Sequence, residues 1–454
     1  MKYVPVLIVG SGIAGLSTAY YLKRKNIEFE VITKSKNIYE NNTSIAPANI
    51  RLNNILDTVR KCGANEEIAK RIDDAIYEIP RMLEDLGIEF EKSKFGIIPA
   101  RKTNIAGGMQ LTRALCNHVG TIATDQQLID INIYDESICC LLYSKTKDEF
   151  TNLVCNYLVL STGGFVGIFS KNDNVKSSIG EGIVLAKENG ANLKGMSTIM
   201  FHPFATNHGN RILTGDEVLF SKGKILNKYE EELLIEPKLE AAIRENNYHD
   251  SDIFVELVKT FHQLIKEHGE IYIKIQDQMV RIEPTAHYTS GGIEVDADYR
   301  VFGNVFANGE NTFDGDKGIG RLPGQAFAFS IVSGKVIADK ISSMRFMRPN
   351  GPEYIPKQKV KILSEENTNF DLISKNKILS NIIQEIYHYD DRNDRQKLIE
   401  YQMNCQNIID DVLINGRGVK EQGQKLLDFY YKTYIANEIL KDKLRRNASC
   451  RLVK

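Results

Sequence analysis

The chain has 454 residues, which at roughly 100 to 200 residues per domain indicates two to four domains and excludes a single small module. Its 42% apolar and 26% charged residues are typical of globular proteins and exclude wholesale disorder. The 58 basic residues balance 59 acidic ones, so a formal net charge of -1 predicts no global attraction to nucleic acid or anionic lipid.

The cysteines and the hydropathy pattern bear on metals and location. Seven cysteines are scattered without a CxxC pair, which disfavours structural zinc and iron–sulfur clusters, so we expect no metal site. An odd, dispersed count fits a reducing cytosol. No stretch approaches the ~20 apolar residues of a membrane span, and the apolar run near the N-terminus is too short for a signal segment. The sequence therefore predicts a soluble, cytoplasmic protein.

The first predicted elements form a β-α-β unit. A β-branched strand at residues 6–9 precedes the letters GSGIAG, a helix follows at 16–25, and a second strand covers 29–33. The glycines at positions 10, 12 and 15 give the G-x-G-x-x-G pattern, which permits a tight turn and close approach of a pyrophosphate to a helix N-terminus. Dinucleotide binding is the favoured interpretation, and a structural turn is the alternative.

The acidic residue that usually ends the second strand and holds the adenosine ribose is missing. Thr33, Lys34 and Ser35 stand there instead. Either a hydroxyl and a lysine hold this part of a dinucleotide, or the cofactor is gripped elsewhere.

The middle of the chain continues the α/β pattern. Residues 41–101 are polar and helix-prone, as in an insertion, and a helix is predicted at 109–119. Strand-like segments cover 128–143, a buried apolar strand, YLVLSTGG, ends at Gly164, and a helix with a glycine stop covers 180–190. A strand that ends on glycines is typical of a ligand-facing sheet edge.

The second half changes pattern twice. Residues 196–283 combine short strands with a charged helix at 252–268, which suits an inserted cap domain. A strand at 301–307 and an apolar helix at 324–340 return to the first domain. Residues 362–444 are charged and mostly helical.

Six segments, taken in their order, resemble the flavoprotein family of succinate dehydrogenase, fumarate reductase and L-aspartate oxidase. They are VLIVGSGIAGLS with VITKS, LVLSTGG, IGEGIVLAKENGA, MFHPFA, PTAHYTSGGIEVD and VFANGENTFDGDKGIGRLPGQAFAFSIVSG. The resemblance implies an α/β fold in which a Rossmann-like FAD-binding domain is interrupted by an α+β capping domain and followed by a helical C-terminal domain. The expected boundaries are 1–195, 196–286, 287–345 and 352–454.

The resemblance also implies FAD as the cofactor. The stretch NNTSIAPANI has no histidine at the place of the family's covalent flavin link, so we expect noncovalent FAD. The implied FAD ligands are Gly10, Ser11, Gly12, Ala14, Gly15, Thr33, Lys34, Thr162, Gly163, Glu310, Gln325, Ala326 and Phe327.

Four further residues are implied to face a small dicarboxylate at the isoalloxazine: His202, Thr214, His287 and Arg321. The chemistry agrees, since a guanidinium offers a bidentate fork to a carboxylate and the other three offer further hydrogen bonds. The alternatives are a satisfied core histidine for His202 and for His287, a structural ion pair for Arg321, and a slipped alignment for Thr214.

The family's proton-shuttling arginine in the cap is absent. The best match, SDIFVE, puts Glu256 at its place, where a carboxylate is expected to repel a dicarboxylate and to disfavour fumarate reduction. Compensation by Lys259, Arg281, Arg101 or Lys102 stays open, as does entry of Tyr288 or Lys317 into the site. The RGEGG and GGHSHRR segments of the family are also replaced, by LFSKGK and KSKFGIIPARK.

The leading functional hypothesis is an L-aspartate oxidase-like enzyme that converts L-aspartate to iminoaspartate for NAD biosynthesis. Oxygen or fumarate is the expected electron acceptor, and quinolinate synthase is an implied partner. One alternative is a soluble fumarate reductase or succinate dehydrogenase flavoprotein-like enzyme acting on another dicarboxylate. The other is a diverged FAD-binding protein without this catalysis.

Overall fold

The computed structural model describes residues 2–53, 65–93, 96–100, 105–206, 211–248, 251–313, 324–348, 355–363, 370–387, 395–418 and 420–451. Four residues named above lie outside these ranges, namely Arg101, Lys102, Lys317 and Arg321.

The largest sheet has eight strands in the order β16-β17-β8-β1-β2-β5, with β7 and then β6 extending from β8. The strands are β1 (Lys2–Val9), β2 (Phe29–Ile32), β5 (Ile122–Ala123), β6 (Gln127–Tyr134), β7 (Ser137–Ser144), β8 (Glu149–Leu160), β16 (Arg300–Phe302) and β17 (Val305–Ala307). The pairs β17–β8, β8–β1, β1–β2 and β2–β5 are parallel. The register sets Val9 opposite Leu160, so β1 and β8 end side by side. The glycine-rich segments that follow these two strands therefore meet at one edge of the sheet.

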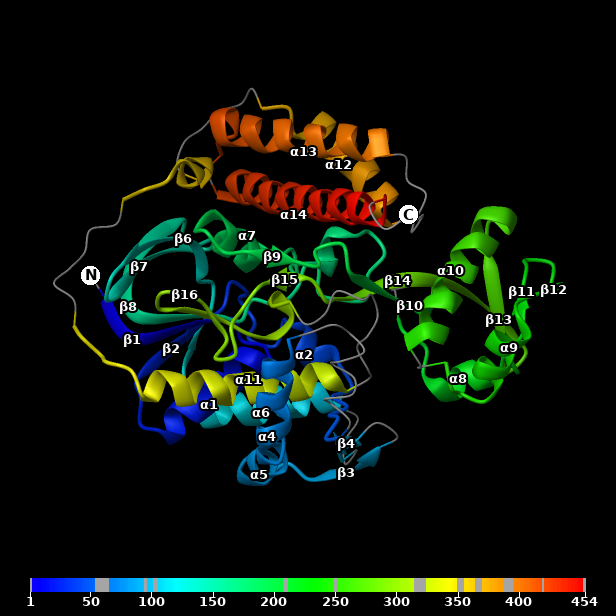
Figure 1. Ribbon diagram of the computed structural model, residues 1–454, viewed down its shortest axis with the longest axis horizontal. Helices are drawn as coiled ribbons and strands as arrows, with labels where there is room; N and C mark the ends of the chain where they lie inside the picture. The colour runs from blue at the N-terminus through cyan, green and yellow to red at the C-terminus, as the bar shows by residue number, and fades with distance from the viewer. Residues whose placement is uncertain are drawn as a thin grey trace.

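Helices cover both faces of this sheet (Figure 1). On one face lie α1 (Ile13–Arg24), α6 (Gly107–Val119) and α11 (Gln325–Ser342), beside α2 (Asn42–Ile45), α4 (Glu66–Ala75), α5 (Glu78–Asp85) and the hairpin of β3 (Phe90–Ser93) with β4 (Gly96–Pro99). On the other lie α7 (Glu181–Glu188) and the C-terminal helices α12 (Leu372–Tyr387), α13 (Arg395–Asn415) and α14 (Lys420–Arg451). The central parallel strands β1, β8 and β17 are buried over most of their paired residues, as strands covered on both faces require.

The C-terminal helices share one hydrophobic core with the sheet. Ile435 of α14 packs so tightly on Gly180 that a Cβ there would lie 2.8 Å from its side chain. This contact holds α14 directly over the start of α7.

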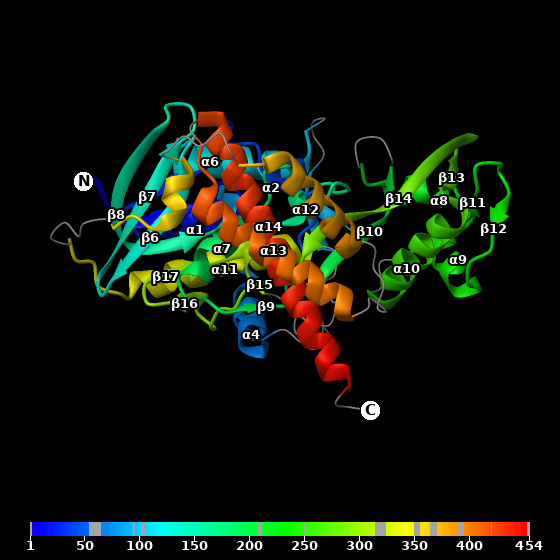
Figure 2. The ribbon, with the colours of Figure 1, turned by 90° about the horizontal axis from the view of Figure 1, so that it is seen from above.

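A second, antiparallel sheet of five strands projects to one side of the molecule (Figures 1 and 2). It contains β10 (Ile199–Thr206), β14 (Gln278–Thr289), β13 (Ile271–Ile275), β11 (Ile225–Leu226) and β12 (Glu232–Leu233), with α8 (Gly215–Leu219), α9 (Pro237–Arg244) and α10 (Ser251–His268) around it. It has a hydrophobic cluster of its own, which includes Phe204, Tyr248 and Phe261. We call residues 199–289 the cap. The long strands β10 and β14 carry the chain out of the sheet domain and back.

The predicted β-α-β unit and the helices at 109–119, 180–190, 252–268 and 324–340 are confirmed, with ends shifted by a few residues. The prediction of one strand over 301–307 is wrong. Gly303, with a φ of +46°, and Asn304 turn the chain there, so β16 and β17 pair as an antiparallel hairpin. Among the described residues, no helix is both long and apolar enough to cross a membrane.

Candidate active site

A cavity of about 1380 Å³ extends from the carboxyl ends of β1 and β8 to the cap strands β10 and β14. Most of the described residues that the sequence assigned to FAD and substrate line it, from the glycine loop, from the strand ends and from the cap. It exceeds the ~300–1,000 Å³ of a usual ligand pocket, as a dinucleotide together with a small substrate requires.

The glycine loop forms the floor of the cavity. Gly10 has a φ of +121°, and a Cβ there would lie 2.2 Å from the Ser161 carbonyl oxygen. A Cβ on Gly15 would lie 2.1 Å from the Gly10 carbonyl oxygen, so this glycine serves close packing of α1 on the loop. Gly12 ends the loop as the N-cap of α1 and has no atom closer than 3.5 Å to a Cβ, which leaves room above the helix N-terminus. This is the geometry that admits a pyrophosphate.

A buried carboxylate from another part of the chain lies at the end of β2, where the usual acidic residue of the strand is missing. Glu181, the first residue of α7, forms an ion pair of 2.5 Å with Lys34, and both line the cavity. Its Oε2 atom is buried and has no hydrogen-bond partner in the described structure. Sequence reasoning did not assign Glu181 to the cofactor, because the acid comes from a distant helix rather than from the strand that follows the glycine loop.

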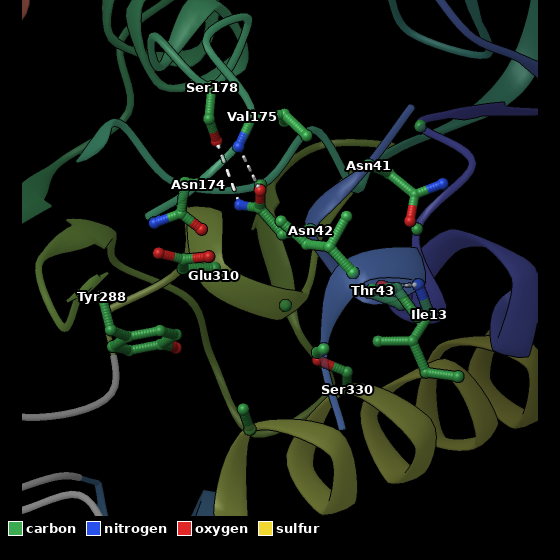
Figure 3. A pocket seen from close by; sticks show the side chains of 18 of the residues that line it. Ile13, Asn41, Asn42, Thr43, Asn174, Val175, Ser178, Tyr288, Glu310 and Ser330 are labelled. Atoms are coloured by element: carbon green, nitrogen blue, oxygen red, sulfur yellow. Dashed lines mark hydrogen bonds between the residues drawn. The ribbon is translucent and has the colours of Figure 1, made fainter. Parts of the chain in front are cut away.

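Asn42 and Thr43 connect the two sides of the cavity at its middle (Figure 3). The Ile13 backbone N–H donates to Thr43 Oγ1 over 2.9 Å at the start of α1. Asn42 accepts from the Val175 backbone N–H over 2.9 Å and donates to Ser178 Oγ over 3.4 Å. The loop before α7 is thereby held against the glycine loop.

Glu310 projects into the cavity beside Asn174 and Tyr288 (Figure 3). Its Oε1 accepts hydrogen bonds from the Thr289 backbone N–H over 3.1 Å and from Thr289 Oγ1 over 3.3 Å. Burial raises the pKa of Glu310 from 4.5 to about 7, against the hydrogen bonds from Thr289 and the nearby His287, which favour the carboxylate. A carboxyl group with this pKa is a hydrogen-bond donor in part of the molecules at neutral pH.

Two histidines face each other at the cap end of the cavity. The ring centroids of His202 on β10 and His287 on β14 are 5.7 Å apart. His202 Nδ1 lies 3.2 Å from the Phe204 backbone N–H, whereas His287 Nδ1 lies 2.6 Å from Asp173 Oδ2. Both histidines and Asp173 line the cavity. Asp173 was missed, because the loop before α7 carries no pattern that points to it.

Thr214 and Arg211 form the outer wall on the cap side. Thr214 is the N-cap of α8, and its hydroxyl is 3.1 Å from Glu217 Oε2 and accepts from the Glu217 backbone N–H over 3.3 Å. Arg211 pairs with Glu217 through two hydrogen bonds of 2.9 and 2.8 Å. The Arg211 guanidinium holds the pKa of Glu217 down at about 2. Thr214 thus lies at the cavity, but its hydroxyl caps the N-terminus of α8. Arg211 was not foreseen.

Of the other described residues predicted for the site, most line the cavity and two do not. Ser11, Ala14, Thr33, Thr162, Gly163, Ala326, Phe327 and Tyr288 also line the cavity. Gly15 and Gln325 are not among the described wall residues. Gln325, the first residue of α11, is buried.

The expectation that Glu256 opposes a dicarboxylate is wrong. Its side chain is 43% exposed, pairs with Lys238 over 2.7 Å and is not among the described residues of the cavity wall. On the same helix, Phe254 reaches the cavity, because two positions apart is about 200° around a helix. Arg281 pairs with Glu270 over 2.5 Å, and neither it nor Lys259 is among the wall residues that the structure describes.

The residues present fit FAD. A floor that a Cβ would fill, a helix N-terminus above it and a buried carboxylate oxygen without a partner suit a pyrophosphate and the hydroxyl donor of a ribose. Ala326 and Phe327 at the start of α11 and Glu310 after β17 also line the cavity.

Comparison with known proteins gives consistent results. Residues 5–326 match the family model described as FAD binding domain. The L-aspartate oxidase of Clostridium perfringens is 25% identical over 393 residues, which cover 75% of this chain and 87% of that protein. The 8-methylmenaquinol:fumarate reductase flavoprotein subunit of Wolinella succinogenes is 24% identical, with 74% and 65% covered. A quinol fumarate reductase structure from E. coli aligns with a TM-score of 0.72 at 16% identity, covering 97% of this chain and 89% of that one.

Proposed function

The chain belongs to the FAD binding domain family, and from that premise we propose that this FAD-dependent oxidoreductase is L-aspartate oxidase-like and oxidises L-aspartate to iminoaspartate. The proposal extends to noncovalent FAD, to oxygen or fumarate as the electron acceptor and to a cytoplasmic role in NAD biosynthesis with quinolinate synthase as a partner.

One observation carries the proposal. The cavity begins at the glycine loop and ends at His202, His287 and Asp173. Hydrogen-bond donors and acceptors therefore both lie at the end away from the glycine loop. A small substrate with carboxylate and amino groups needs both donors and acceptors there. The names of the aspartate oxidase relatives support the same substrate class.

FAD, when bound, supplies a two-electron oxidant for the Cα–H bond of the substrate. The protein's part is to orient that bond and to manage the proton of the amino group. His202 and, by resemblance, Arg321 contribute donors for the carboxylates, while Leu213, Tyr248 and Phe254 line the cap side with apolar surface and exclude water.

The direct test is an anaerobic titration of the FAD-loaded protein with L-aspartate and then with succinate, following the flavin absorbance band. We expect L-aspartate to bleach the band and succinate to leave it unchanged. Bleaching by succinate alone would favour the fumarate reductase-like alternative, which the Wolinella relative supports. An unchanged band with both compounds would contradict the proposal.

A further inference from the structure

The two cavity histidines differ in what their Nδ1 atoms contact. The Phe204 backbone amide always carries its hydrogen, so His202 Nδ1 is the acceptor in the 3.2 Å contact and carries no proton. The proton of a neutral His202 then sits on Nε2, which makes the side chain a donor.

His287 has the opposite assignment. A carboxylate oxygen accepts hydrogen bonds, so the 2.6 Å contact with Asp173 Oδ2 places a proton on His287 Nδ1. In a neutral ring this proton makes Nε2 the basic atom, and the adjacent carboxylate stabilises the imidazolium that forms when Nε2 takes up a second proton.

Backbone and side-chain hydrogen bonds to β14 hold Asp173 beside the His287 ring. Its backbone N–H donates to the Ala286 carbonyl, next to His287 on β14, and the following residue, Asn174, donates from Nδ2 to the His287 carbonyl over 2.8 Å. The other carboxylate oxygen, Asp173 Oδ1, is buried and has no hydrogen-bond partner in the described structure. The negative charge is therefore compensated mainly by the His287 ring.

We propose that Asp173 is the positioning residue that makes His287, and not His202, the proton acceptor of the oxidation. This inference rests on the proposed function. In the step, an N–H bond of the substrate ammonium breaks and an Nε2–H bond forms on His287, which leaves a neutral amine. With the amine neutral, its lone pair would form the C=N bond of the iminium product as the Cα–H bond breaks, and the electron pair of that bond would pass to the two-electron oxidant that bound FAD would supply.

Several titratable groups surround His287 and belong to any account of its pH dependence. They are Asp173 on the loop before α7, His202 on β10 and Glu310 after β17. Asp173 contacts the His287 ring directly, through the 2.6 Å contact between Oδ2 and Nδ1.

The experiment compares the wild type with Asp173→Asn, Asp173→Glu and the matched control Asp148→Asn, which makes the same change at a carboxylate bonded to Tyr143 over 2.7 Å and away from the described cavity wall. The first measurement is the rate of flavin reduction by L-aspartate against pH. We expect Asp173→Asn to lower the plateau rate about 100-fold or more and to move the midpoint to lower pH, because the imidazolium loses its carboxylate. Asp148→Asn should match the wild type.

The second measurement needs no turnover. ¹⁵N NMR of imidazole-labelled FAD-loaded protein, with the His287 signals identified by their loss in His287→Gln, follows the ring through a pH titration. We expect a proton on Nδ1 in the neutral wild-type ring and a lower midpoint in Asp173→Asn. Asp173→Glu restores the charge and should lie nearer to the wild type.

Identical His287 titrations in the wild type and in Asp173→Asn would overturn the inference, as would identical behaviour of Asp173→Glu and Asp173→Asn. Should Asp173→Asn fail to fold, a wild-type ring without a proton on Nδ1 would also overturn it. Failure of L-aspartate to reduce the wild-type flavin contradicts the proposed function instead, and the NMR titration still decides the role of Asp173.

Discussion

The two sides of the cavity are built from different materials. On the FAD side, the floor is made of backbone and glycine, placed by the aligned ends of β1 and β8. On the cap side, side chains from β10, β14, α10 and the segment before α8 form the wall. A backbone wall tolerates almost no added atom, whereas a side-chain wall can be altered residue by residue. Substitutions should therefore abolish cofactor binding on the first side and tune chemistry on the second.

The sharpest test of the backbone wall is Gly10→Ala. The methyl group would lie 2.2 Å from the Ser161 carbonyl oxygen, and the φ of +121° is strained for any side chain. We expect at least a tenfold fall in the ratio of flavin to protein after purification, measured by absorbance. Gly120→Ala is the matched control, because it has a φ of +100° but no atom within 4 Å of the added methyl group. A Gly10→Ala protein with full FAD content would contradict the account of the floor.

Glu310 lies where the two walls meet, and its effect should appear as a pH dependence. The pKa of its carboxyl is about 7 in the folded chain and 4.5 ordinarily, so the protonated form is favoured on folding. Its contribution to stability is present below pH 4.5 and is lost as the pH rises through about 7.

Glu310→Gln should remove this loss. Relative to the variant, the wild type should lose about 2 kcal/mol of unfolding free energy between pH 4.5 and 8, a value reduced to allow for water in the cavity. Urea unfolding of the FAD-loaded proteins at several pH values measures it. Glu256→Gln, the same change at an exposed carboxylate, serves as the control. Parallel curves for the wild type and Glu310→Gln would refute the assignment.

On the cap side, Thr214→Ala separates a structural from a substrate-binding hydroxyl. The hydroxyl caps α8, so its removal should cost about 1 kcal/mol of unfolding free energy, and Thr214→Ser should restore most of that. Denaturant unfolding measures the stabilities. The L-aspartate concentration that gives half of the maximal rate of flavin reduction measures the effect on substrate binding. If Thr214→Ala leaves the stability unchanged but raises that concentration tenfold, the hydroxyl binds substrate rather than stabilising the N-terminus of α8.

The same contrast explains which parts could be predicted. The glycine loop is contiguous in sequence, and its turn and helix start require glycine at fixed spacings. The roles of Gly10, Gly12 and Gly15 can therefore be predicted from the sequence. His202 and His287 were reached only through resemblance, since they lie on separate strands that pair in the cap. Asp173 and Glu181 come from a loop and a helix start whose approach to the cavity depends on tertiary packing, and no local pattern encodes that.

Glu256 provides the smallest and most discriminating test, because the sequence placed it in the site and the structure does not. Its carboxylate pairs with Lys238 on the outer side of α10, while Phe254 of the same helix faces the cavity. An exposed pair of this kind contributes about 0–1 kcal/mol. Glu256→Gln should therefore change stability by less than 1 kcal/mol and leave the rate and substrate dependence of flavin reduction unchanged. Phe254→Ala, two positions away, should weaken substrate binding by removing apolar surface that excludes water. A tenfold gain in substrate affinity in Glu256→Gln would return this carboxylate to the site and overturn the helix orientation on which the cap wall depends.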